Sequence, residues 1–170
     1  MSNPEYVRLM ARYNLWQNDN LISAADRLDD DARRADRGAF FGSIEATFSH
    51  LLWADRVWLG RFTGEGLPPG GIPQSTALIE EWGSFRQQRM LMDRRILDWA
   101  DHLQPDWFQG EIGWHSGALG RHITRPKTEL AVQMFNHQTH HRGQIHAMLT
   151  AAGMRPADTD VPFMPEIYAR

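Results

Sequence analysis

The feature that most constrains this chain is a set of four long segments in which apolar residues recur at helical spacing. These segments run from about Pro4 to Leu28, from Ser43 to Phe62, from Ser75 or Thr76 to Leu103, and from Pro126 to Ala152. Residues three and four positions apart share one face of a helix, so each segment predicts an amphipathic helix with one buried side. Four such helices in one short chain predict an all-α fold, a four-helix bundle.

Glycine, proline and short polar residues mark where the predicted helices begin and end. Asn3 or Ser2 can cap the first helix, and Gly153 is the expected residue just after the last one. The stretch TGEGLPPGGIPQ, residues 63–74, is a clear break between the second and third helices. Residues 104–125 alternate around a Ser-Gly-Ala-Leu-Gly turn, which favours a short irregular or β-hairpin insertion between the third and fourth helices.

The remaining connections carry little helical signal. The stretch DDDARRADRG, residues 29–38, reads as a solvated connection whose charges could extend a helix. The tail after residue 153 holds three prolines and is expected to be extended. The chain has 170 residues, a typical length for one domain, so we expect residues 1–170 to form a single bundle domain.

Composition excludes several kinds of function. The chain has no cysteine, which rules out disulfides, thiolate metal sites and a cysteine nucleophile. Its net charge is −3 and its arginines lie mostly beside acidic residues, so we expect no nucleic-acid partner. No apolar run approaches the roughly 18 residues of a membrane span, and the N-terminal residues lack the apolar core of a signal peptide. We therefore expect no membrane partner and a cytoplasmic location.

Histidines gather in the stretch FNHQTHHRGQIHAM, residues 135–148, which holds four of the chain's eight. On a helix, His137 and His141 lie about 40° apart on one face, and imidazoles at this spacing can bind one ion. His140 lies about 60° from His137 on the other side and could replace His141, so helix phase alone leaves the second ligand open. His146 points to the opposite side and is expected to lie outside such a site.

A third ligand would have to come from another helix. His50, in the stretch ATFSHLLWADRVW, lies among apolar residues in the middle of the second predicted helix. Facing helices of a bundle often build a metal site together, although a hydrogen-bonded core histidine is the simpler alternative. Three imidazoles would leave coordination positions open, which is typical of catalytic sites. The segment HQTHH lacks the glutamate of a His-Glu-x-x-His protease helix.

Several other polar residues fall on predicted apolar faces. Asp55 lies on the apolar face of the second helix, where we expect a buried ion pair with Arg142 as its partner; a catalytic acid is the alternative. Four amide side chains either orient groups at a metal or form hydrogen bonds in the core: Asn14, Asn20, Gln133 and Gln144.

Three stretches resemble the DinB family (DinB/YfiT-like proteins). SIEATFSHLLWADRVWLGRF is similar to that family's second helix, FNHQTHHRGQIHAMLTAAGMRPADTDV to its last helix and the segment after it, and YNLWQNDNLISA to its first helix. The resemblance implies an up-down-down-up bundle that is often dimeric. It also implies a divalent metal on three histidines, which match His50, His137 and His141, with His140 at the neighbouring non-ligand position.

The resemblance also suggests a class of chemistry. Relatives in the family include thiol-dependent enzymes, among them mycothiol-dependent maleylpyruvate isomerases and bacillithiol S-transferases. It implies a metal-dependent homodimeric enzyme of the S-transferase, isomerase or hydrolase type. Such an enzyme would activate water or a low-molecular-weight thiol toward a small-molecule substrate. The alternative is a non-catalytic metal-binding or stress-response module. For three imidazoles we expect zinc or nickel, with iron and cobalt as further candidates.

Overall fold

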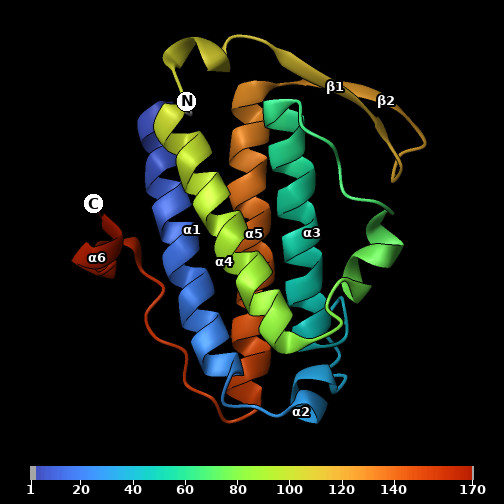
Figure 1. The fold of residues 1–170 in the computed structure, drawn as a ribbon, viewed down its shortest axis with the longest axis vertical. Helices are drawn as coiled ribbons and strands as arrows, with labels where there is room; N and C mark the ends of the chain where they lie inside the picture. The colour runs from blue at the N-terminus through green and yellow to red at the C-terminus, as the bar shows by residue number, and fades with distance from the viewer. Residues whose placement is uncertain (1–2, 170) are drawn as a thin grey trace.

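Four long helices form a bundle in the computed structural model of this chain, which describes residues 3–169 (Figure 1). They are α1 (Pro4–Ala25), α3 (Ile44–Thr63), α4 (Trp82–His102) and α5 (Lys127–Ala151). Helices α1 and α5 run in one direction and α3 and α4 in the other. The four helices pack side by side in a ring, in the order α1, α4, α3, α5, and α5 closes the ring against α1. The predicted all-α four-helix bundle is therefore confirmed, and its up-down-down-up connectivity is the one that the family resemblance implied.

Capping residues lie at the helix ends, and two of them, Asn3 and Gly153, are those that the sequence predicts. The Asn3 side chain accepts a hydrogen bond from the Tyr6 amide at 2.8 Å, while the alternative cap Ser2 lies outside the described residues. The Ser43 hydroxyl accepts one from the Ala46 amide at 3.1 Å. Gly153 follows α5 with a φ of 81°, in the left-handed region that favours glycine. These caps satisfy backbone groups that a helix leaves unpaired at its ends.

A cluster of buried charges lies in the bundle interior. Asp55 of α3 and Asp93 of α4 share one cation, Arg89 of α4, and all three side chains are almost completely buried. An Arg89 Nη1–Asp55 Oδ2 distance of 2.6 Å joins α4 to α3, and a two-point contact at 2.8 and 3.1 Å joins Arg89 to Asp93. Asn18 of α1 donates to Asp93 at 2.8 Å, and Gln138 of α5 donates to Asp55. The cluster therefore connects all four helices.

The partner predicted for Asp55 is wrong. Asp55 pairs with Arg89, whereas Arg142 donates to the Asn14 side chain and lies 5.6 Å from the centre of the Tyr13 ring. Arg142 lies on the face of α5 that packs on α1, so its guanidinium contacts a residue of α1 and not Asp55 of α3. The expectation of a buried ion pair at Asp55 was correct, and only the identity of the cation was not.

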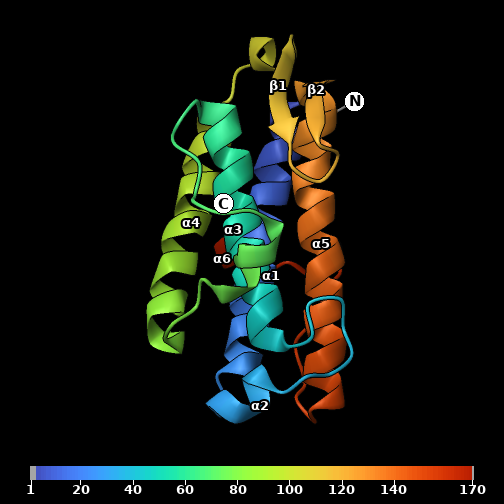
Figure 2. The same ribbon diagram turned by 90° about the vertical axis from the view of Figure 1, so that its right-hand side faces the viewer.

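The third long helix begins later than predicted. Instead of starting at Ser75 or Thr76, α4 starts at Trp82, and residues Ile72–Ala77 form a separate 3₁₀ helix, η1, that packs on α3. The Ser49 hydroxyl of α3 holds this segment by donating to the Ser75 carbonyl at 2.7 Å and accepting from the Leu78 amide at 2.8 Å. Figure 2 shows the crossover returning over α3 before α4 begins.

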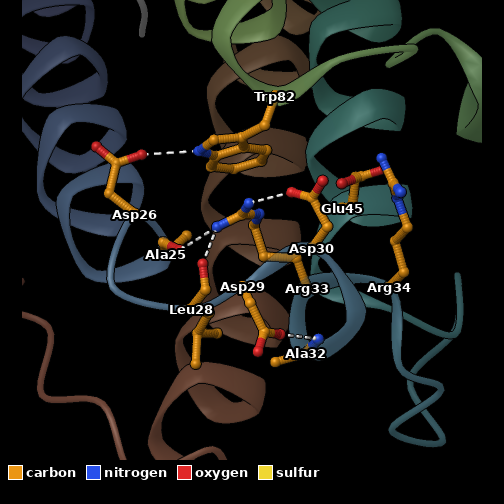
Figure 3. A network of polar contacts seen from close by, with 10 residues as sticks. All are labelled: Ala25, Asp26, Leu28, Asp29, Asp30, Ala32, Arg33, Arg34, Glu45 and Trp82. Atoms are coloured by element: carbon orange, nitrogen blue, oxygen red, sulfur yellow. Dashed lines mark hydrogen bonds and ion pairs between the residues drawn. The ribbon is translucent and has the colours of Figure 1, made fainter.

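The stretch expected to be a solvated connection contains a short helix, α2 (Asp30–Arg34), with a buried arginine. Arg33 lies under Trp82, with its guanidinium carbon 4.7 Å from the ring centre, and donates to the carbonyls of Ala25 and Leu28 (Figure 3). The Trp82 indole donates to Asp26 at 2.7 Å. Arg33 thus satisfies carbonyls at the end of α1 while it packs against the start of α4.

A hairpin and an extended tail complete the fold. Strands β1 (Glu111–Ser116) and β2 (Arg121–Pro126) pair antiparallel after a short 3₁₀ turn, η2 (Pro105–Phe108), as expected. The hairpin is anchored on α3 because the Trp114 ring contacts the Trp58 ring edge to face, with ring centres 5.7 Å apart, and the Arg61 guanidinium packs on both rings, at 4.7 and 4.8 Å. The tail is extended except for η3 (Val161–Phe163) and α6 (Glu166–Ala169). In residues 3–169, no helix is both long enough and apolar enough to cross a membrane.

The buried cluster generates a stability prediction. Replacing Arg89 by Ala removes the one cation that Asp55 and Asp93 share and leaves buried carboxylates without compensation. We expect the free energy of unfolding to fall by about 3–5 kcal/mol, measured by urea denaturation. The control is Arg86→Ala on the same helix, because Arg86 pairs with Asp26 at the surface, where such pairs contribute about 0–1 kcal/mol. Equal losses in the two variants would contradict this account.

Candidate metal centre

The first element of the site is His50, in the middle of α3. The residue is only 4% exposed, and the Phe41 ring packs on its imidazole at a tilt of 31°, with 4.1 Å between ring centres. Its Nδ1 lies 2.8 Å from the Ser75 hydroxyl of η1. One nitrogen is therefore engaged by the crossover segment, and Nε2 is left to face α5.

The second element is the pair His137 and His141, which lie one turn apart on α5. The centres of their rings are 4.4 Å apart, and each ring lies about as close to His50, at 5.1 and 4.9 Å. The Nε2 atoms of His50 and His137 are separated by 3.1 Å. Helices α3 and α5 pack side by side (Figures 1 and 2), so the three imidazoles converge from two helices. One nitrogen atom from each of the three rings can be chosen so that all three atoms lie within 4.8 Å of one another.

Burial keeps these rings neutral at physiological pH. The pKa of His50 is lowered to about 3, mainly because the ring is buried and also because the other two imidazoles lie close to it. Burial and the neighbouring His141 and His140 rings lower the pKa of His137 to about 4, and burial lowers the pKa of His141 despite its contact with Gln144. Neutral imidazoles keep the lone pair that a metal ion requires.

The hydrogen-bond pattern fits a cation between the rings. His141 donates from Nδ1 to the Gln144 side-chain carbonyl at 2.8 Å, so its Nε2 carries a lone pair. Two neutral nitrogens only 3.1 Å apart, as in His50 and His137, need a proton or a cation between them. That separation also matches two bonds of about 2.0–2.1 Å to one shared ion. The buried Nδ1 of His137 has no hydrogen-bond partner among the described residues. The triad could therefore hold a metal ion.

The structure resolves the choice that helix phase left open between His140 and His141. His141 joins the cluster, whereas the His140 side chain is exposed and lies beside the cluster, with its ring centre 4.9 Å from that of His141 and its Nε2 3.3 Å from the Gln144 amide. His146 lies on the α1 side of α5, beside Tyr13 and Arg142, as predicted. The remaining three histidines are exposed: His102, His115 and His122.

The amide side chains have separate roles. Of the four singled out in the sequence, only Gln144 reaches the triad. Asn14 contacts Arg142 in the core, and Gln133 is exposed. Asn20 pins the tail to α1, since its side chain donates to the Ala157 carbonyl and accepts from the Ala157 amide. Asp55 is engaged in the buried ion cluster, which supports the expectation of an ion pair over that of a catalytic acid.

Sequence reasoning missed two neighbours of the triad, Phe41 and Ser75. Both lie in connections without helical periodicity, so no repeating pattern predicts which way their side chains point. Ser75 lies within the proline- and glycine-rich crossover, where the only available signal was a helix start that proved wrong.

Comparison with known proteins agrees with this geometry. The DinB family model matches residues 1–169 of the chain. The chain is also 28% identical over 162 residues to Protein DinB of Bacillus subtilis (strain 168), and the match covers 92% of this chain and 91% of that protein. A bundle with up-down-down-up connectivity and a histidine triad between its second and last long helices is what the resemblance implied. The chain belongs to the DinB family.

Proposed function

We propose that this protein is a metal-dependent enzyme in which His50, His137 and His141 hold one divalent transition-metal ion. The observation that carries the proposal is the convergence of three neutral imidazoles, from two helices, on one partly buried point. Three protein ligands with open positions are typical of catalytic metal sites, whereas structural sites are closed by four. No fourth histidine or carboxylate joins the cluster among the described residues.

The donor set favours borderline transition metals. Imidazole nitrogen suits zinc, nickel, iron and cobalt, whereas calcium and magnesium prefer oxygen ligands. Zinc and nickel are the ions we propose first. Ligand type alone does not separate them, because affinity order and availability also decide which ion a cell inserts.

The chemistry proposed is activation of a thiol or of water. A divalent ion held by imidazoles lowers the pKa of a thiol or water that binds to it, and so supplies a nucleophile at neutral pH. Because the chain contains no cysteine, a thiol at this site would have to come from a small molecule. The protein's own residues hold the rings: Gln144 orients His141, and Phe41 shields His50 from water on one side. The reactions consistent with this arrangement are S-transfer, isomerisation and hydrolysis.

The ligand assignment is tested by removing single histidines. We expect His137→Ala to lose most of its bound metal, because two imidazoles bind an ion far more weakly than three. His146→Ala should retain it, since that ring lies on the other side of α5. Elemental analysis of both proteins after identical purification measures the metal per chain. Equal metal content in the two variants would sink the assignment.

The activity is tested with metal-loaded protein and a panel of low-molecular-weight thiols, each paired with several electrophiles. We expect at least one thiol to be consumed faster with wild-type protein, and the gain to vanish with a chelator and in His137→Ala. Loss of free thiol and formation of the adduct are followed by mass spectrometry; water as nucleophile is scored in the same reactions without thiol. Metal binding without any turnover across the panel would favour the non-catalytic alternative, an ion that only joins α3 to α5.

A further inference from the structure

We propose that Ser75, in the crossover between α3 and α4, is a positioning residue for the metal site. Its hydroxyl selects the tautomer of His50 in which Nδ1 carries the proton and Nε2 presents its lone pair to the ion. The inference rests on the proposed metal site and extends it to a segment, η1, that lies outside the two helices that carry the histidines.

The donor and acceptor roles of Ser75 follow from its contacts. The side chain is completely buried, and its hydroxyl donates to the Ile72 carbonyl at 2.6 Å. A serine hydroxyl has one proton, so toward His50 Nδ1, at 2.8 Å, the oxygen can only accept. His50 therefore donates from Nδ1, and its unprotonated nitrogen is Nε2, the atom 3.1 Å from His137.

The backbone of Ser75 is held in place by Ser49 of α3, and this contact does not depend on a bound ion. Its carbonyl accepts from the Ser49 hydroxyl at 2.7 Å, and the same hydroxyl accepts from the Leu78 amide at 2.8 Å. Ser49 directly precedes His50 on α3, so one short piece of helix holds both the ligand and the segment that orients it. Hydrogen bonds of this kind to the second nitrogen fix the tautomer and orientation of metal-binding histidines.

The three rings differ in how firmly they are held. His50 is oriented by the crossover and His141 by Gln144 of its own helix, while the Nδ1 of His137 has no partner among the described residues. Within residues 3–169, the hydrogen bond between Ser75 and His50 is the contact that couples the crossover to the site. By thermodynamic linkage, an ion that prefers the oriented ring also stabilises the packing of η1 on α3.

The first test measures zinc affinity by competition with a chromophoric chelator. Replacing Ser75 by Ala should weaken zinc binding about 10- to 100-fold, the range found when such outer hydrogen bonds are removed. Ser84→Ala, a serine exposed on α4, is the matched control and should bind as the wild type does. Unchanged affinity in a folded Ser75→Ala protein overturns the inference and leaves the proposed function intact. Absence of zinc binding by the wild type overturns both.

A second measurement needs no variant at position 75 and reports on orientation directly. Nitrogen-15 spectra of the metal-free wild type show which imidazole nitrogen carries the proton, with the His50 signals identified by their loss in His50→Gln. We expect the proton on Nδ1 of His50. A proton on Nε2 overturns the inference whether or not Ser75→Ala folds. In a folded Ser75→Ala protein, we expect a mixture of the two tautomers.

A third measurement, amide hydrogen exchange, tests whether metal binding is coupled to the crossover between α3 and α4. Zinc should slow amide hydrogen exchange in residues 75–78, including the Leu78 amide that donates to Ser49, and the slowing should be lost in Ser75→Ala. Exchange in the β1–β2 hairpin, at the end of the bundle near the start of α5, serves as the internal control. Equal protection of residues 75–78 with and without zinc in the wild type contradicts the coupling.

Discussion

The interaction on which the rest of the structure depends is the pairing of Asp55 with Arg89 inside the bundle. Charges at this depth are tolerated only when they are paired and hydrogen-bonded, so the helices must lie where their partners meet. Arg89 also holds Asp93, and amide groups from α1 and α5 complete the cluster. Sliding one helix along another by a turn, about 5.4 Å, would separate these groups and leave a charge unpaired. The cluster therefore sets the relative positions of the four helices.

The same positions bring the histidines together. Gln138, which donates to Asp55, directly follows His137 on α5, and Asp55 lies five residues after His50 on α3. The two helices run antiparallel, so the alignment that pairs Gln138 with Asp55 also sets His137 and His141 opposite His50. A core interaction and a candidate metal site thus share one helix alignment. The crossover adds a third element, because Ser49 and Ser75 hold η1 against the same part of α3.

Much of this fold could be predicted from local patterns. Apolar spacing identified the four long helices, and the i, i+4 spacing of His137 and His141 identified the face of α5 that carries the ligands. Spacing did not separate His141 from His140, since both lie within reach of His137 on a helix. That choice depends on which side of α5 faces α3, and only the packing of the two helices shows that His140 points to solvent. The pattern of apolar residues proposed His50 as a candidate third ligand but favoured a hydrogen-bonded core histidine, and the resemblance to the DinB family favoured the ligand.

The sequence by itself determined the helices, their apolar faces, the histidine pair on one face and the absence of any thiol ligand, because each depends on residues close together in the chain. Only the tertiary structure decided that Asp55 pairs with Arg89 and not Arg142, that Arg33 is buried under Trp82, and that Ser75 lies against His50. These contacts join residues separated by 25 to 49 positions. Their formation depends on which helix faces which and on the path of the crossover, and a helical repeat carries no information about either.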